Sequence, residues 1–239
     1  MILEHTFVEE THQYLVEGFF VLSTSSILSL CGFTNYEGIP KPVLDHASWR
    51  GKQTHLAVEY LEKAVRAGES VQKAAAAVWS QLVGPLEEIK PFLKGYLKFR
   101  HEYEYEPVGE LEKGICYLHD EVAVGCHIDT RGRIHGKGFQ GRVAIGDVKT
   151  AAKNYGQAMK QKLLAYRLQL QSYKEASHFD EEWLKEVTPD SIGRFIVNPD
   201  KEGNYNFYDF SSMDDEIFWD SSVRIAALKL AHGHKIEAK

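Results

Sequence analysis

The stretch VAVGCHIDTRGRIHGKGFQGRVAIGDVKT, residues 122 to 150, places two acidic residues and a lysine on consecutive strand-like runs. Apolar residues alternate with small or polar ones from Val122 to Ile128. An apolar run then resumes from Val143 to Val148, after a glycine-rich segment. This pattern predicts a β-hairpin made of these two runs.

Three charged residues lie at the ends of the predicted strands. Asp129 closes the first run, and Asp147 and Lys149, two residues apart near the end of the second, should point to one face. Two carboxylates can hold a hard divalent cation, and an ammonium beside them can orient or polarise an attacking water. An exposed salt bridge is the alternative. The apolar strands, the upstream Asp129 and the long helix that follows favour metal-assisted cleavage of a phosphate ester.

The segment between the two runs, GKGFQG at Gly136 to Gly141, matches the G-x-G-x-x-G pattern of dinucleotide-binding loops. Here the glycines join one predicted strand to another and do not open a helix. Because no helix N-terminus is available to receive a pyrophosphate, we interpret the segment as a flexible hairpin turn.

Outside this stretch the sequence alternates short strands with helices. Apolar spacing and turn residues predict a hairpin over residues 5–22, helices over 43–67, 71–83, 85–103, 155–176 and 213–231, an extended segment over 107–116, and strands over 191–198 and 205–210. Gly51 and His55 lie four residues apart and so share a helix face. The aromatic residues Tyr96, Phe99, Tyr103 and Tyr105 are predicted to pack in the core.

Composition bounds the class of protein. The chain has 239 residues, 44% of them hydrophobic, which is enough for one substantial core. Its formal net charge of −6 excludes a generally basic surface, so any contact with nucleic acid must use a local patch and a bound metal. Three cysteines without C-x-x-C spacing disfavour a zinc or iron–sulfur site. With no apolar run near about 18 residues and an acidic N-terminus, we expect a cytoplasmic protein without membrane contact.

Several motifs, taken in order, resemble the PD-(D/E)XK nuclease superfamily, and within it the RecB-like exonucleases. The resemblance covers roughly residues 5 to 210. The matching residues are His12-Gln-Tyr14 with Gly18, the run Val21 to Leu28, Gly51-Lys-Gln-Thr-His55, Asp129, Asp147-Val-Lys149 and Gln169-Leu-Gln-Ser-Tyr173. The ordered series is more specific than any of its members.

The resemblance implies a set of site residues. It assigns one or two Mg²⁺ or Mn²⁺ ions to Asp129, Asp147, the Val148 carbonyl, His55 and a glutamate, and it gives Lys149 the role of positioning or activating water. The glutamate is Glu112, with Glu110 as the open alternative. The expected DNA contacts are Gln169 and Tyr173 on the helix that covers the sheet, and the basic residues Arg50, Lys52 and Lys153.

The resemblance also implies a fold and an activity. We expect an α/β (α+β) protein with a restriction-endonuclease-like core, in which helices flank a central mixed β-sheet. We expect residues 1–239 to form one nuclease domain, with a helical subregion at about 40–105, the catalytic sheet and covering helix at about 107–210 and a C-terminal helix and tail at 211–239. The expected activity is that of a metal-dependent exonuclease acting on single- or double-stranded ends of linear DNA in recombination or repair, with a single-strand annealing or helicase protein as a partner.

Three rivals remain beside the exonuclease. The first is a structure-specific endonuclease of the same fold. The second is a non-catalytic DNA-binding recombination module, whose signature would be a broken acid or lysine motif. The third is a glycosidase with paired carboxylates such as Glu110 and Asp129, which would need no metal and would leave Lys149 without a task.

Overall fold

The computed structural model describes residues 1–8, 13–150, 157–185, 187–188 and 191–234, with side chains from residue 162 onward in the third range. Its strands are β1 (Ile2–Leu3), β2 (Thr6–Val8), β3 (Gln13–Val16), β4 (Phe19–Ser23), β5 (Tyr105–Pro107), β6 (Lys113–His119), β7 (Val122–Ile128), β8 (Thr130–Ile134), β9 (Arg142–Val148), β10 (Gly193–Pro199) and β11 (Tyr205–Asp209). The α-helices are α1 (Thr24–Leu30), α2 (Lys41–Arg66), α3 (Val71–Ala77), α4 (Lys90–Glu102), α5 (Gln157–Ser177), α6 (Glu181–Leu184) and α7 (Glu216–Ala231).

The strands form two mixed sheets, so the predicted α/β class is confirmed, although the chain uses two sheets where one central sheet was expected. One has the order β1-β6-β7-β4-β3-β2 and the other β11-β10-β9-β8-β5. Within them, β4 runs parallel to β7 and β9 runs parallel to β10, while the remaining pairs are antiparallel.

The predicted pairing of residues 122–128 with 143–148 is wrong. Strand β7 pairs with β6 and β4, and the antiparallel partner of β9 is β8. The glycine-rich segment does join two strands, β8 and β9, as predicted. The alternation of apolar and polar residues did not predict β8, because this strand, TRGRI, carries a buried arginine where a buried strand position usually has an apolar residue.

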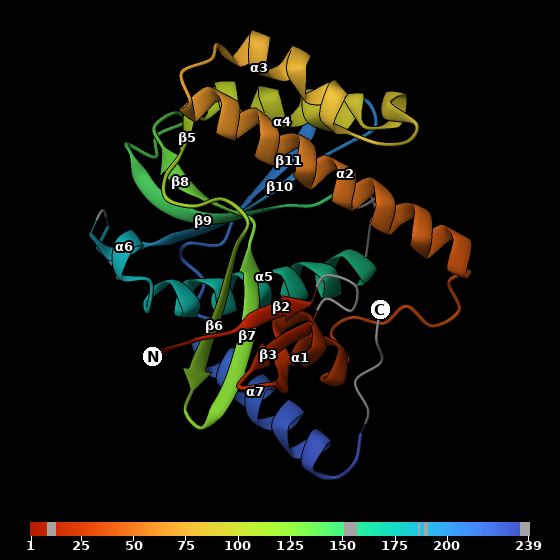
Figure 1. Ribbon diagram of the computed structural model, residues 1–239, viewed down its shortest axis with the longest axis vertical. Helices are drawn as coiled ribbons and strands as arrows, with labels where there is room; N and C mark the ends of the chain where they lie inside the picture. The colour runs from red at the N-terminus through yellow and green to blue at the C-terminus, as the bar shows by residue number, and fades with distance from the viewer. Residues whose placement is uncertain (9–12, 151–156, 186, 189–190, 235–239) are drawn as a thin grey trace.

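The helices cover the five-stranded sheet on both sides (Figure 1). Helix α4 packs against β10, β11 and β5, and α2 lies against α3 and α4. Helix α5 crosses the opposite face, against β9 and β10, and also contacts β6 and β7 of the other sheet. Because successive side chains of a strand point to opposite faces of the sheet, the side chains of β9 point alternately towards the α4 side and the α5 side.

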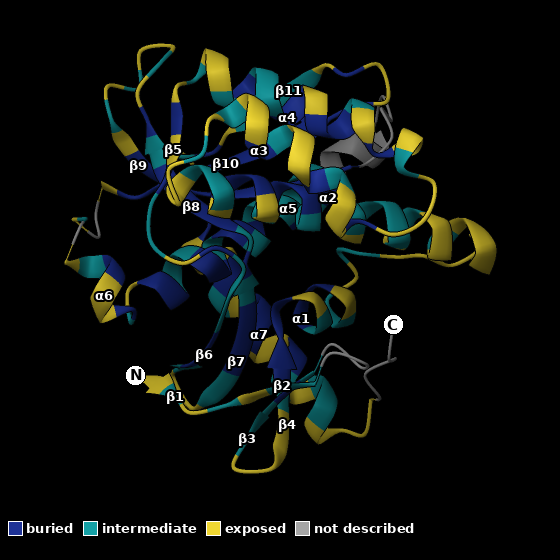
Figure 2. Cartoon of the chain, turned by 45° about the horizontal axis from the view of Figure 1, so that its top comes forward, coloured by how far each residue is buried: buried dark blue, intermediate teal, exposed yellow. Residues whose placement is uncertain are grey.

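Burial follows this layering: β9 and β10 are almost wholly buried, whereas the outer helix faces and much of β1 to β4 are exposed or intermediate (Figure 2). The predicted aromatic packing is confirmed, because Tyr96, Phe99 and Tyr105 are at most 2% exposed and share one apolar cluster. Ile145 on β9 belongs to the other cluster, which lies under α5. In the described part of the chain, no helix is both long and apolar enough to cross a bilayer.

Candidate metal centre

The two predicted aspartates lie where strands end. Asp129 occupies the single position between β7 and β8, at which the chain passes from the six-stranded sheet to the five-stranded one. Asp147 is the penultimate residue of β9 and is fully buried. It shares its side of the strand with Ile145, two residues earlier, and therefore faces the α5 side of the sheet.

Lys149 extends the line of β9 beyond its last strand residue. Its backbone N–H donates to the Val197 carbonyl of β10 at 2.9 Å, which fixes its position. Its ammonium contacts the carboxylate of Asp147 and lies 5.6 Å from the ring centre of Tyr166 on α5. Burial lowers the pKa of Lys149, but the carboxylates of Asp147 and Asp129 outweigh burial and raise it above its ordinary value, so this lysine is held as a cation.

His55 reaches the two strand ends from α2. Its Nε2 atom lies 2.6 Å from the Val148 carbonyl oxygen, and because a carbonyl only accepts, Nε2 carries the proton. Its Nδ1 atom then faces two carboxylates, 3.3 Å from Asp129 Oδ2 and 3.5 Å from Glu112 Oε1. Histidines that bind metals are commonly oriented in this way, with one nitrogen donating to a backbone carbonyl and the other directed at the ion.

Glu112 completes the group from the connection before β6. The predicted extended segment over 107–116 is interrupted here, because β5 ends at Pro107 and β6 begins at Lys113, so Glu110 and Glu112 lie in a connection between strands. Glu112 has a left-handed backbone with φ of 51°, which interrupts the extended chain, and its N–H donates to the Asp129 carbonyl at 3.1 Å. Glu110 is exposed and lies 3.8 Å from Lys113, so geometry joins Glu112 to His55 and Asp129.

The acidic groups of this cluster are incompletely neutralised. Although Lys149 is in ion-pair contact with Asp147, neither carboxylate oxygen of Asp147 accepts a hydrogen bond from the described residues, and neither does Asp129 Oδ2. Burial, and then the neighbouring Asp129, raise the pKa of Asp147 to about 8. Buried carboxylate oxygens without donors are costly, so the cluster calls for a further positive charge.

The donor set fits a hard divalent cation. One ligand atom each of His55, Glu112 and Asp129 lie within 4.8 Å of one another. Burial lowers the pKa of His55, but the carboxylates of Asp129 and Glu112 outweigh burial and raise it to about 10, so without an ion His55 is an imidazolium that donates from Nδ1. Once an ion replaces the Nδ1 proton, three carboxylates (Asp129, Asp147 and Glu112) against the ammonium of Lys149 leave a formal charge of −3 + 1 = −2, which one divalent ion balances. Carboxylate oxygens with one imidazole suit Mg²⁺ or Mn²⁺. The Val148 carbonyl keeps a second lone pair beside its hydrogen bond to His55.

Gly51, one turn before His55, faces the same region. A Cβ atom placed there would meet only Thr150 Oγ1, at 3.8 Å, which is ordinary contact. The fold itself therefore does not require glycine at this position.

The residues predicted to contact DNA divide into several groups. Arg50 donates to the Thr150 carbonyl at 3.2 Å and lies over the Phe92 ring, so it ties α2 to the chain beyond β9. Lys52 is exposed. Gln169 donates to the Tyr173 hydroxyl at 2.5 Å, and Tyr173 is only 3% exposed. Lys153 lies outside the described residues.

Tyr173 lies against the acidic cluster. Burial raises its pKa well above the ordinary value, and the carboxylates of Asp129 and Asp147 add to the shift. Its hydroxyl thus remains protonated, and Gln169 and Tyr173 are placed beside the acids more than on the outer surface.

The sequence analysis missed the residues that support the cluster. His127 donates through Nε2 to the Glu112 carbonyl, and it lies two residues before Asp129 on β7, a spacing that could have identified it. Asp180 lies 2.7 Å from Arg131 and 2.9 Å from Lys113, and so joins the residue after Glu112 to the strand that starts after Asp129. No local pattern indicates Asp180, which lies 49 residues beyond Arg131.

Comparisons with known proteins add little to this geometry. No protein-family model matches the sequence, and no curated protein matches it. One similar solved structure, "Crystal structure of SSO0001", has 13% sequence identity, a TM-score of 0.36 and coverage of 77% of this chain and 76% of that chain.

Proposed function

We propose that this protein is a metal-dependent deoxyribonuclease, and specifically an exonuclease that hydrolyses phosphodiester bonds from DNA ends. The observation that carries the proposal is the group of buried carboxylate oxygens of Asp147 and Asp129 that accept no hydrogen bond from the described residues, in contact with a lysine held as a cation. Metal-assisted hydrolysis of a phosphodiester uses both elements: oxygen ligands for a divalent ion and a positive group near the attacked phosphate.

Each side chain has a role in this proposal. Asp129, Glu112 and His55 Nδ1 would hold Mg²⁺ or Mn²⁺. Asp147, whose carboxylate lies beside Asp129, and the Val148 carbonyl would supply further oxygens. When bound, the ion lowers the pKa of a coordinated water and neutralises charge that develops on the phosphate. Lys149, kept charged by its acidic neighbours, donates hydrogen bonds to the water or to a non-bridging phosphate oxygen.

The choice of DNA ends rests on the sequence resemblance to RecB-like exonucleases and not on the site alone. On the protein side, the exposed Lys52 on α2 and the open surface at Gly51 lie beside His55 and leave room for a phosphate backbone. Because the chain has a net charge of −6, its affinity for DNA would depend on this local surface and on the metal.

The test compares end-labelled linear DNA with closed circular DNA, in Mg²⁺, Mn²⁺ or EDTA, for the wild type and Lys149→Ala. We expect metal-dependent loss of the linear substrate only, and none with Lys149→Ala. The matched control is Lys41→Ala, which removes an exposed lysine 3.1 Å from Asp45 and should leave cleavage unchanged.

The other outcomes select among the rivals. Nicking of the circular DNA would replace the exonuclease by a structure-specific endonuclease. Metal-dependent binding without cleavage of either substrate would indicate a DNA-binding module, and cleavage that survives EDTA would refute the metal mechanism.

A further inference from the structure

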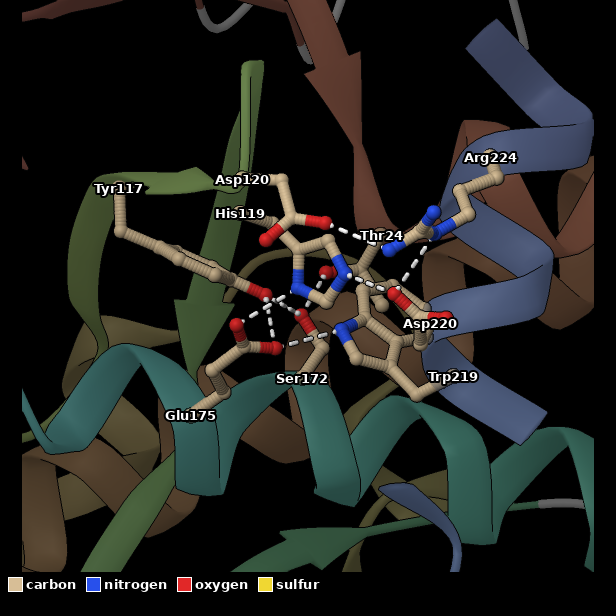
Figure 3. Close-up of polar contacts among 9 residues, drawn as sticks. All are labelled: Thr24, Tyr117, His119, Asp120, Ser172, Glu175, Trp219, Asp220 and Arg224. Atoms are coloured by element: carbon tan, nitrogen blue, oxygen red, sulfur yellow. Dashed lines mark hydrogen bonds and ion pairs between the residues drawn. The ribbon is translucent and has the colours of Figure 1, made fainter. Parts of the chain in front are cut away.

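A second polar cluster lies away from the candidate metal centre, where β6, α5, α7 and α1 meet (Figure 3). Its centre is His119, the last residue of β6, whose side chain is 12% exposed. The ring lies between Glu175 of α5 and Asp220 of α7. Nothing in the proposed nuclease chemistry uses these residues.

Both ring nitrogens of His119 face a carboxylate. Nδ1 lies 2.6 Å from Glu175 Oε1, and Nε2 lies 3.2 Å from Asp220 Oδ1. A neutral imidazole has one N–H and one lone pair, so it can satisfy only one of these contacts and turns its lone pair against the other carboxylate. The imidazolium donates to both. The geometry is therefore that of a protonated histidine bridging two acids from different helices.

The charged surroundings of His119 favour the cation. Glu175 comes from α5, Asp220 and Arg224 come from α7, and Asp120 comes from the turn after β6. Arg224 lies 2.8 Å from Asp120 and 3.0 Å from Asp220, and so partly neutralises the outer side of the cluster. Glu175 has no arginine or lysine partner among the described residues and depends on His119 for its counter-charge.

Glu175 also connects the cluster to the interior. Its Oε2 atom accepts from Trp219 Nε1 at 2.8 Å and from the Tyr117 hydroxyl at 3.4 Å. Trp219 belongs to α7, is 1% exposed and packs in the apolar cluster under α5. Loss of the charge on His119 would therefore weaken the same contacts that hold the first turn of α7 in place.

A chain of hydroxyl groups continues from this cluster. Tyr117 lies 3.2 Å from Ser172 Oγ, and Ser172 lies 2.7 Å from Thr24 Oγ1 of α1, which donates to the Gly125 carbonyl of β7 at 3.4 Å. The cluster thus joins α7 to α5, α1 and the six-stranded sheet. Helix α7 lies at the outside of this group: it buries Trp219, Val223 and Ala226, and its outer face exposes Ile217, Phe218 and Leu228.

We propose that His119 is a proton-dependent clamp: with both ring nitrogens protonated it docks α7 onto β6 and α5 through Asp220 and Glu175, and loss of its proton releases α7. The trigger is solution pH, and the moving element is α7 with Trp219. The clamp does not depend on the nuclease proposal, because its test measures the docking of a helix and not cleavage.

The direction of the effect follows from linkage. The hydrogen bond to Glu175 raises the pKa of His119 above its ordinary 6.5, and the carboxylates of Glu175 and Asp220 outweigh the opposing effect of burial. A raised folded-state pKa gives stability that is complete below pH 6.5 and is lost as pH rises through the folded-state value. Release of α7 frees one proton in this window, so its opening equilibrium should rise about tenfold per pH unit.

Hydrogen exchange measured by mass spectrometry on the full chain tests the clamp. After correction for the intrinsic pH dependence of amide exchange, protection of the α7 amides in the wild type should fall about tenfold per pH unit above about pH 6.5, while α2 stays protected. In His119→Gln, α7 should be less protected at low pH and should show no pH-dependent loss. The matched control is His46→Gln, which removes an exposed histidine 3.0 Å from Glu88 and should behave as the wild type.

A second variant keeps the test decisive if His119→Gln does not fold. Asp220→Asn leaves the bond between His119 and Glu175 in place and removes one partly exposed carboxylate, so the folded-state pKa of His119 falls and the loss of α7 protection above pH 6.5 should end at a lower pH and be smaller than in the wild type. A pH-independent α7 in the wild type, or the same pH dependence in the wild type and both cluster variants, would overturn the clamp.

Discussion

Asp147 should destabilise the protein in the absence of metal, so that Asp147→Asn makes the metal-free protein more stable. Burial and the neighbouring Asp129 raise the pKa of Asp147 from 3.8 to about 8. Ionising this group therefore costs folding stability; the penalty is absent below pH 3.8 and complete above about pH 8. At pH 7 the penalty corresponds to the difference between pH 7 and the ordinary pKa of 3.8, about three pKa units. This sets an upper bound of about 4 kcal/mol on the loss of folding stability.

Asparagine recovers only part of this free energy. The substitution removes the ion pair with Lys149, whose side chain is 21% exposed and still faces Asp129. Losing one partner of a buried pair is itself costly. We expect a net gain of about 1–2 kcal/mol in the free energy of unfolding, or about 2–8 °C in Tm for a chain of this size.

Metal should act in the opposite direction. Wild-type protein at a metal concentration of about 100 times Kd gains about 2.7 kcal/mol, whereas the variant lacks one carboxylate ligand and should gain far less. The assay is thermal unfolding at pH 7 in EDTA and across a Mn²⁺ titration. The variant should melt higher in EDTA and the wild type higher in saturating Mn²⁺.

The control is Asp45→Asn, which removes an exposed acid paired with Lys41 and should change neither curve. If Asp147→Asn melted at a lower temperature than the wild type in EDTA, the inference that the Asp147 carboxylate is incompletely neutralised would be refuted. An equal shift with Mn²⁺ in the wild type and Asp147→Asn would refute the role of Asp147 as a ligand.

Three further substitutions separate binding, positioning and chemistry. Lys149→Met should reduce DNA cleavage by about 10²- to 10³-fold and leave the Mn²⁺-induced rise in Tm intact, which a joint cleavage and melting assay would check; a lost Tm shift would make Lys149 structural. Asp180→Asn should weaken Mn²⁺ binding about tenfold in calorimetry, because it releases Arg131 and Lys113 beside the acids; unchanged affinity would contradict positioning. Gly51→Ala should keep or slightly raise Tm but weaken DNA binding in fluorescence anisotropy, since the added methyl fits the fold and occupies the open surface; unchanged affinity would exclude a contact there.

Periodicity predicted most of the elements because their apolar faces are local properties. The predicted helix over 43–67 is α2 (Lys41–Arg66), and the one over 155–176 is α5 (Gln157–Ser177). The N-terminal hairpin around Gly18 is also confirmed.

The pairing of strands was not predictable in the same way, and β8 shows why. Arg131 is 1% exposed, which is possible because Asp180 neutralises it and Trp183 lies 4.6 Å away under its guanidinium. Both partners come from a segment about fifty residues later, so the local sequence reads as a polar turn. Without β8, the two flanking apolar runs appeared to pair with each other.

The sequence predicted the strand residues of the candidate metal centre, but it did not predict the residues that support them, His127 and Asp180. Asp147 and Lys149 share a face by spacing alone, whereas the approach of His55 depends on how α2 lies across the end of β9. His119 gave no signal, because its acidic partners are Glu175 and Asp220, 56 and 101 residues away.

The candidate ligands come from α2, the connection before β6, the junction of β7 with β8 and the end of β9, and this dispersion has a consequence for biosynthesis. A chain emerging from the ribosome cannot assemble the ion-binding group until Asp147 has been made and the two sheets have joined at Asp129. Partly folded forms would lack affinity for the ion, so divalent metal would select the finished fold from the ensemble. In the proposed function, metal-dependent cleavage would therefore be absent from the nascent chain until these four segments have come together.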